Sequence, residues 1–369
     1  MSKPSTLLGL IRFRFCLLLV AACPLPLLVS CSSNPPRQSF DQAPVFPAAP
    51  DQPRFVYERT LQTSEDVQRL TGFQRFKVMA TGKPVQVRGL VKPYGVAVHQ
   101  GRVYVTDTAQ RAVLVFDIPG GRFREFGEED PGQLRKPIGI AVSREGEVYV
   151  ADVVARRVMV YDADGHYRRS VGSDELLRRP AGVALSPDAT RLYVVDVGGL
   201  DNNDHRVQVF DAHSGAHLQT IGTRGVEHGQ FNLPLQDAVA PDGTLYVVDG
   251  GNFRVQAFDP NGQFLFSFGE VGRFPGQFAR PKGIAVDPQG NIYVVDTAFG
   301  NVQIFNPKGQ LLMFIGTRDV AGKPGKFFLP AGVAVGEDGR VYMVDQYFRK
   351  VEVFKPLAAL QNKTAANDP

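Results

Sequence analysis

Short apolar runs separated by turn residues fill most of this 369-residue chain. The segment 281–316 shows the pattern most fully, because Gly283–Val286, Ile292–Val295, Val302–Phe305 and Leu311–Ile315 are separated by stretches rich in Gly, Pro, Asn and Asp. Such runs predict four short antiparallel strands in a meander. Because one four-stranded sheet cannot bury both of its faces alone, the unit must pack against further units.

The same pattern occurs six times along the chain. Each copy starts with Pro-x-Gly-(Ile/Val)-Ala-(Val/Leu), continues with Tyr-x-x-Asp and ends with an aromatic residue. The copies start at Pro93, Pro137, Pro180, Pro234, Pro281 and Pro330, and the fourth is degenerate. A four-stranded unit repeated every 43 to 54 residues favours a closed ring over a linear solenoid or a sandwich. We therefore predict an all-β fold, a six-bladed β-propeller of four-stranded antiparallel blades.

The ends of the repeat region indicate how the ring closes. The last copy stops after its third strand, Val351–Phe354, and Arg54–Leu61 before the first copy has a strand pattern but no unit of its own. We expect this N-terminal strand to become the outer strand of the last blade, which closes the propeller and removes an exposed edge. The predicted propeller spans residues 54–357, and the polar tail 358–369 is expected to be disordered.

The repeats resemble the NHL repeat family over about residues 54–357. The resemblance rests on motifs such as Pro281-Lys-Gly-Ile-Ala-Val-Asp-Pro-Gln-Gly-Asn-Ile-Tyr-Val-Val-Asp296 and His205-Arg-Val-Gln-Val-Phe-Asp211. It implies a six-bladed propeller but selects no function, because NHL propellers include lyases, sensor domains, RNA-binding modules and scaffolds.

Residues 1–30 have the pattern of a signal peptide, with basic residues followed by an apolar stretch from 15 to 29. Leu28–Cys31 resembles a bacterial lipoprotein box, in which the cysteine is acylated, so we expect lipidation at Cys31. The alternative is an ordinary cleavage site beside an incidental cysteine. Residues 31–53 are rich in proline and are expected to form a semi-extended tether. Cys31 is followed by Ser32 and not by the Asp of an inner-membrane retention signal, which favours the Gram-negative outer membrane and the cell envelope.

Charge is distributed unevenly over the predicted propeller. We name one side the connection face; it comprises the connections between blades (63–92, 128–136, 173–179, 223–233, 270–280 and 317–329) and the loops between second and third strands (108–111, 153–157, 197–206, 250–254, 297–301 and 346–350). The net charge is +11 on these ranges and −10 on the rest of the mature chain. A cationic face attracts an acidic protein or an anionic polymer, although scattered charge on a solvated loop surface is the simpler alternative. The candidate binding residues are Arg135, Lys136, Arg178, Arg179, Arg254, Arg280, Arg349 and Lys350.

Several recurring residues are better explained by structure than by chemistry. One aspartate ends the second strand of each copy, where it can accept hydrogen bonds from loop backbone amides. The tyrosine three residues earlier is expected to pack between blades. The apolar residue three positions before each proline is expected to plug the core. These plugs are Leu90, Leu134, Leu177, Phe231, Phe278 and Phe327.

The fourth copy has Gln236 and Asp237 where the other copies have Gly followed by Val or Ile. These positions open the innermost strand beside the central channel. The polar pair is therefore a candidate for binding a cation or a small molecule in the channel. The alternative is that the pair forms a hydrogen bond to a loop or to an ordered water.

The chain has no recognised catalytic motif, neither H-E-x-x-H nor a P-loop nor a G-x-S-x-G elbow. NHL-type lyases, which this fold resembles, use histidines around the channel, and only His205 and His228 fall on the connection face. Together with Asp201 and Asp204 they are weak candidates for a metal site, because 201–204 is more simply a polar turn.

We therefore expect a lipid-anchored, monomeric binding or scaffolding module of an envelope complex, without catalytic residues or a cofactor. Its expected partner is an envelope protein or an anionic polymer, and nucleic acid is not expected for an exported protein. Two alternatives remain open: a channel-centred, metal-dependent lyase or hydrolase, and a sensor of a small ligand or glycan.

Overall fold

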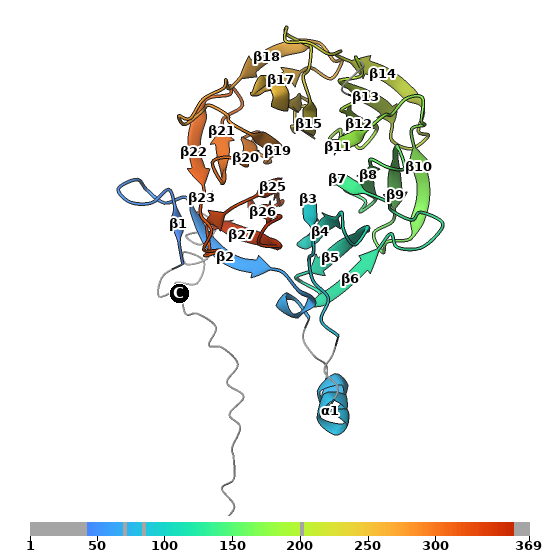
Figure 1. Ribbon diagram of the computed structural model, residues 1–369, viewed down its shortest axis with the longest axis vertical. Helices are drawn as coiled ribbons and strands as arrows, with labels where there is room; N and C mark the ends of the chain where they lie inside the picture. The colour runs from blue at the N-terminus through green and yellow to red at the C-terminus, as the bar shows by residue number, and fades with distance from the viewer. Residues whose placement is uncertain (1–42, 69–71, 83–85, 200–202, 358–369) are drawn as a thin grey trace, which may run out of the picture. The chain divides into compact units, whose positions relative to one another are not determined.

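The computed structural model describes residues 43–68, 72–82, 86–199 and 203–357. Six antiparallel sheets surround a common axis, as Figure 1 shows. The predicted all-β six-bladed propeller is confirmed. The predicted signal peptide, Cys31 and the C-terminal tail lie outside the described residues, and so does most of the predicted tether.

Blades 1 to 5 are meanders whose first strand lies innermost, whereas in blade 6 the innermost strand is the 25th of the chain and the outer strands come from the N-terminal segment. Blade 1 contains β3 (Pro93–His99), β4 (Arg102–Asp107), β5 (Ala112–Asp117) and β6 (Arg122–Phe126). Blade 2 contains β7 (Pro137–Val142), β8 (Val148–Asp152), β9 (Arg157–Tyr161) and β10 (Tyr167–Val171). Blade 3 contains β11 (Pro180–Leu185), β12 (Arg191–Asp196), β13 (Arg206–Asp211) and β14 (His217–Ile221).

Blade 4 contains β15 (Pro234–Val239), β16 (Leu245–Asp249), β17 (Arg254–Phe258) and β18 (Phe264–Phe268). Blade 5 contains β19 (Pro281–Val286), β20 (Ile292–Asp296), β21 (Asn301–Phe305) and β22 (Leu311–Ile315). Blade 6 contains β25 (Pro330–Val335), β26 (Val341–Asp345) and β27 (Lys350–Pro356), joined by β2 (Phe55–Leu61) and β1 (Val45–Phe46). The connection before blade 6 holds the short parallel pair β23 (Thr317–Arg318) and β24 (Lys326–Phe327).

The ring closes as predicted. Strand β2 pairs antiparallel with β27, with Tyr57 opposite Phe354 and Leu61 opposite Val351. Glu58 and Arg340 add an ion pair across this junction, with 3.1 Å between Oε1 and Nη2. The outermost strand β1 was not predicted; it lies in the range assigned to the tether and pairs with β2.

The first connection also contains an unpredicted helix, α1 (Gly72–Thr81). Its sequence carries no acidic residue in the first turn and no basic residue in the last turn, so it lacks the charge pattern that marks helix ends. No helix in the described ranges is long and apolar enough to cross a membrane.

The hydrophobic core lies between the blades and not within them. Tyr104 of blade 1, for example, packs with Ile140 and Val150 of blade 2, and the six repeated tyrosines are all buried. The six predicted plugs are at most 6% exposed, which confirms their structural role. This arrangement makes each blade depend on its two neighbours for burial of its faces.

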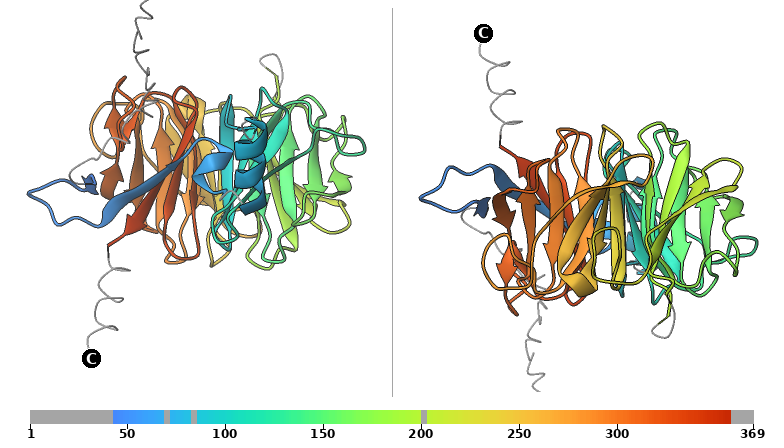
Figure 2. Two further views of the ribbon diagram at one scale, coloured as in Figure 1. Left: turned by 90° about the horizontal axis from the view of Figure 1, so that it is seen from below. Right: turned by 90° about the horizontal axis from the view of Figure 1, so that it is seen from above.

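Glycine in the Pro-x-Gly motif lets the innermost strands meet around the axis. A Cβ added at Gly95 would lie 2.4 Å from the Ile138 carbonyl oxygen of the next blade, and one at Gly283 would lie 2.5 Å from that of Ala331. Such distances are shorter than any side chain tolerates, so the motif sets the close approach of the strands. Figure 2 shows the ring from the side, with loops emerging on two opposite faces. One of them is the connection face. We name the opposite one the turn face; it carries turns such as Asp259–Gly262 and Asp287–Gly290.

Candidate functional site

The six repeated aspartates are fully buried and hold the connection face together. In blade 1, Asp107 Oδ2 accepts hydrogen bonds from the backbone amides of Val91 and Lys92, and Oδ1 accepts from Ala109 and Gln110. The aspartate therefore joins the incoming connection to the loop between second and third strands. Equivalent bonds in the other blades confirm the predicted structural role.

These hydrogen bonds hold the residues that directly precede the repeated prolines, so that one such segment from each blade lies around the propeller axis. Their backbone amides are fixed by the aspartate, so their side chains are free to point elsewhere. Six of the eight predicted binding residues are exposed on the connection face, namely Arg135, Lys136, Arg178, Arg179, Arg280 and Arg349. Only Arg178 among them forms an ion pair within the described ranges, with Asp204 at 3.7 Å.

The remaining two predicted binding residues have structural roles, and the prediction is wrong for Lys350. Lys350 is 2% exposed because it forms a buried ion pair with Glu352, and its ammonium also donates to the Lys326 carbonyl at 3.1 Å. Arg254 is half-buried and forms an ion pair with Asp249 at 2.9 Å. Neither side chain is available as a free cation for a partner.

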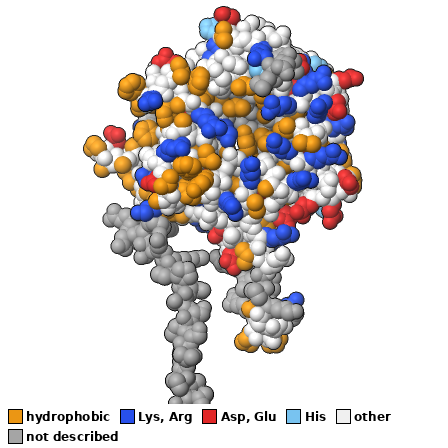
Figure 3. Space-filling view, in the orientation of Figure 1, with side chains coloured by type: hydrophobic (Ala, Val, Ile, Leu, Met, Phe, Trp, Pro, Cys, Tyr) orange, Lys and Arg blue, Asp and Glu red, His pale blue; other side chains and the backbone are white. Residues whose placement is uncertain are grey.

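The basic residues gather at one end of the central channel, which we name the axial mouth. It is bounded by the residues before and after the repeated prolines: Lys92, Lys136, Arg179, Leu233, Arg280 and Leu329 before them, and Tyr94, Ile138, Ala181, Leu235, Lys282 and Ala331 after them. Blades 1, 2, 3 and 5 contribute cations to this ring, and blades 4 and 6 contribute apolar residues. Figure 3 shows Lys and Arg side chains spread over this face, with hydrophobic side chains between them.

Lys282 lies at the centre of this region, and the sequence analysis did not select it. Its Nζ lies 4.8 Å from the centroid of the Tyr94 ring and 3.2 Å from Gln346 Oε1. Burial, together with the positive charges of Arg280 and Lys92, lowers the pKa of Lys282 to about 8. The sequence did contain a sign of its importance. Among the six copies, only the fifth has a basic residue directly after the repeated proline.

The channel narrows directly below the mouth, where Gln236 and Asp237 lie. A cavity of about 40 Å³ remains there, large enough for about one water molecule and too small for a sugar ring. Gln236 Nε2 donates to the Ala181 carbonyl at 3.1 Å, so its amide is used to bind the preceding blade, blade 3. Both carboxyl oxygens of Asp237 are buried without a hydrogen-bond partner in the described ranges, and burial raises the pKa of Asp237 well above its ordinary value. Whether this pair binds a ligand stays a prediction.

The two candidate histidines have different surroundings. His205 is fully buried, and its Nδ1 accepts a hydrogen bond from the Leu233 amide at 3.2 Å, where other blades use the repeated aspartate. Burial lowers the pKa of His205, which favours the neutral ring. His228 is exposed and stacks on Phe264, with ring centroids 4.5 Å apart. Across the described ranges, no three His, Cys, Asp or Glu side chains group as metal ligands do.

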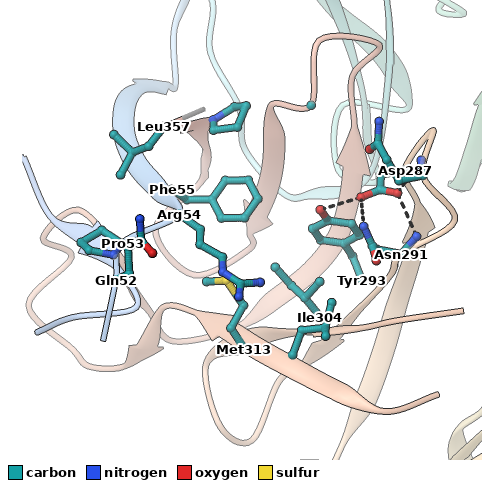
Figure 4. A pocket seen from close by; sticks show the side chains of 14 residues that line it. Gln52, Pro53, Arg54, Phe55, Asp287, Asn291, Tyr293, Ile304, Met313 and Leu357 are labelled. Carbon is teal, nitrogen blue, oxygen red and sulfur yellow. Dashed lines mark hydrogen bonds between the residues drawn. The ribbon is translucent and has the colours of Figure 1, made fainter. Parts of the chain in front are cut away.

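A further pocket of about 380 Å³ lies between blades 5 and 6, where the chain enters β2. Figure 4 shows Arg54 and Phe55 on one side and Asp287, Asn291 and Tyr293 on the other. Asp287 Oδ2 already accepts hydrogen bonds from Asn291 at 2.8 Å and from Tyr293 at 3.1 Å. The carboxylate is thus part of the turn, and the pocket brings no reactive pair together.

Comparison with known proteins supports the repeat assignment. The NHL repeat family matches residues 278–305, and the SMP-30/gluconolactonase/LRE-like family matches residues 95–197. The chain is a six-bladed propeller that carries an NHL repeat. Protein brain tumor of Drosophila melanogaster is 44% identical to it over 52 residues, which are 14% of this propeller chain and 5% of that protein. The propeller chain thus spans about a twentieth of the length of this relative.

Solved structures with the same fold perform unrelated functions. A gluconolactonase from Xanthomonas campestris is 17% identical, with a TM-score of 0.57 over 85% of this chain and 98% of its own. A streptogramin B lyase is 15% identical, with a TM-score of 0.53 over 72% of this chain and 94% of its own. A hydrazine synthase from Kuenenia stuttgartiensis is 15% identical, with a TM-score of 0.52 over 74% of this chain and 97% of its own. Similarity at this level shows the fold alone, so function has to be argued from the site.

Proposed function

We propose that this propeller is an exported, lipid-anchored binding module whose connection face holds an anionic partner in the cell envelope. The observation that carries the proposal is the set of uncompensated cations around the axial mouth. Lys92, Lys136, Arg179 and Arg280 are exposed there, and none forms an ion pair in the described part of the chain. Clustered like charges repel one another in the free protein, and an anionic partner removes that repulsion.

Exposed apolar side chains support a protein partner over a simple polymer. Phe274, Val320 and Val226 on the same face are 74%, 70% and 66% exposed. Apolar anchors surrounded by charged residues are typical of protein interfaces, where the anchors give affinity and the charges steer association. The partner that fits best is therefore an acidic protein surface with apolar side chains of its own.

The N-terminal sequence supports the location. An acylated Cys31 would attach the chain to a membrane, and a proline-rich tether would leave the propeller free to orient toward its partner. Both features are properties of the sequence and lie outside the described residues.

The binding proposal is tested by titrating the purified protein with poly-L-glutamate in a calorimeter. We expect the double variant Lys136→Glu/Arg179→Glu to bind at least about tenfold more weakly, since it reverses two exposed cations at the mouth. Affinity should also fall as ionic strength passes ~0.1 M, where charges are screened over about 10 Å.

Arg144→Glu/Lys308→Glu is the matched control, because it changes the net charge equally but lies in turns of the turn face. We expect the control to bind as the wild type does. Equal loss in both double variants would mean that only net charge matters, and binding that is insensitive to salt would contradict the proposal.

A further inference from the structure

The Lys282 side chain spans a neighbouring blade at the centre of the axial mouth. Lys282 belongs to blade 5, whereas the Tyr94 ring beneath its ammonium belongs to blade 1. Between them, blade 6 has the small Ala331, which leaves room for the lysine to cross. Gln346, in the loop after β26, fixes the ammonium from the side at 3.2 Å. A flexible lysine is thus held in one place by three blades.

The ammonium held there has no counter-charge. None of the ion pairs in the described ranges involves Lys282, and the charged groups that act on it, Arg280 and Lys92, are both cations. A partly desolvated cation without a carboxylate is unfavourable for the free protein, and a group of this kind in a cleft is a candidate for a functional site. Burial and these two neighbours lower the pKa of Lys282 to about 8, which agrees with the geometry.

Other donors surround the same point. Burial raises the pKa of Tyr94 to about 12, so its hydroxyl stays protonated and can donate a hydrogen bond. Arg280 lies close enough to act electrostatically on both Tyr94 and Lys282. We propose that the axial mouth binds a carboxylate or phosphate group, with the Lys282 ammonium, the Arg280 guanidinium and the Tyr94 hydroxyl as its donors.

The shape of the channel keeps this group at the mouth. The cavity below the mouth has a volume of only about 40 Å³, which is room for about one water molecule. The uncharged residues Ile138 and Leu235 belong to other parts of the rim. An oxyanion at the mouth would meet cations from blades 1 and 5 at once. The inference rests on the proposed function and refines it, because it names the chemical group of the anionic partner that is seated on the axis.

Lysine acetylation measured residue by residue tests the site in the purified full chain. At pH 7, Lys282 should react at least about tenfold faster than exposed Lys308 on the turn face, since a lower pKa leaves more neutral amine. Phosphate at ten times its dissociation constant should slow Lys282 by about tenfold and leave Lys308 unchanged. Sodium chloride at equal ionic strength is the control for general screening.

A hexaglutamate peptide in place of phosphate distinguishes the source of the oxyanion. Protection by the peptide supports an acidic protein segment, and protection by phosphate alone supports a free or lipid-borne phosphate. No protection of Lys282 by either probe, or equal slowing of Lys308, would overturn the inference.

Lys282→Met separates this inference from the proposed function, and Lys308→Met is its matched control. We expect Lys282→Met to remain folded, to lose the rise in unfolding temperature that phosphate gives the wild type, and to bind poly-L-glutamate about tenfold more weakly. If Lys282→Met binds as tightly as the wild type while Lys136→Glu/Arg179→Glu does not, the inference fails and the proposed function stands. If neither variant alters binding, both fail.

Discussion

At the residue scale, one buried aspartate per blade links the two segments that build the connection face. Asp296 accepts hydrogen bonds from the amides of Ala279, Arg280, Ala298 and Phe299, at 2.8 to 3.1 Å. The same contacts that stabilise the fold therefore position Arg280 beside the axial mouth. Under the proposed function, these residues would serve both stability and binding.

Asp296→Ala should leave four backbone donors without their acceptor. We expect the free energy of unfolding to fall by about 3 kcal/mol or more, because unpaired buried polar groups lose their full hydrogen-bond energy. Urea denaturation measures the change. Asp259→Ala in a turn of the turn face, which removes two exposed hydrogen bonds, is the control and should cost less than about 1 kcal/mol. Equal losses would show that the repeated aspartate has no special role.

Asp237 should make stability depend on pH. Burial raises the pKa of Asp237 in the folded protein, whereas the pKa in the unfolded chain is that of an ordinary aspartate. At a pH between these two pKa values, the folded protein therefore binds more protons than the unfolded chain. Stability must then fall as pH rises above about 4, and Asp237→Asn should remove that fall. Thermal unfolding at pH 4 and pH 7 measures this. We expect the increase in stability of Asp237→Asn over the wild type to be larger at pH 7 than at pH 4. A gain that is equal at both pH values would contradict the raised pKa.

At the element scale, β2 closes the ring by pairing with β27. Deleting residues 54–62 should expose the edge of β27 and part of the core between blades 5, 6 and 1, which Phe55 and Leu61 cover. We expect a loss of at least about 4 kcal/mol in the free energy of unfolding. Deleting residues 43–49, which removes only β1, is the control and should cost much less. An unchanged melting temperature after the first deletion would refute closure by β2.

The repeat made most elements predictable, and the exceptions have physical reasons. Four strands per unit follow from local apolar runs and turns, and closure follows from counting strands. Strand β1 has only two residues, and α1 lacks charged ends, so neither has a strong local pattern. Lys350 and Glu352 lie two apart in one strand and thus on one side of it, a signal of their buried pair that the charge count ignored.

The site was less predictable than the fold because its contacts join different repeats. Lys282 meets Tyr94 and Gln346 only when blades 5, 6 and 1 are assembled. Single-repeat patterns contain no such information. The cationic character of the connection face was visible in the sequence, whereas the point at which its charges converge required the ring.

At the scale of the whole molecule, we propose that an acylated Cys31 anchors a propeller with one binding face to the membrane. Cys31→Ala should move the protein from the membrane fraction to a soluble or unprocessed pool, because acyl chains provide the anchoring energy. Cell fractionation with mass spectrometry of the N-terminal peptide measures this. A wild-type protein that is soluble and carries no acyl mass would refute the anchor and leave the binding face untouched.

The central claim, that a partner binds the connection face, is tested most directly by photo-crosslinking in living cells. A photoreactive amino acid is placed at Arg179 or Arg280 on the connection face, and at Arg144 or Lys308 on the turn face. We predict that both connection-face positions crosslink to one acidic envelope partner and that the crosslink weakens in Lys136→Glu. Crosslinks to a specific partner from Arg144 and Lys308 alone would show that the protein binds through its opposite face and would contradict the account.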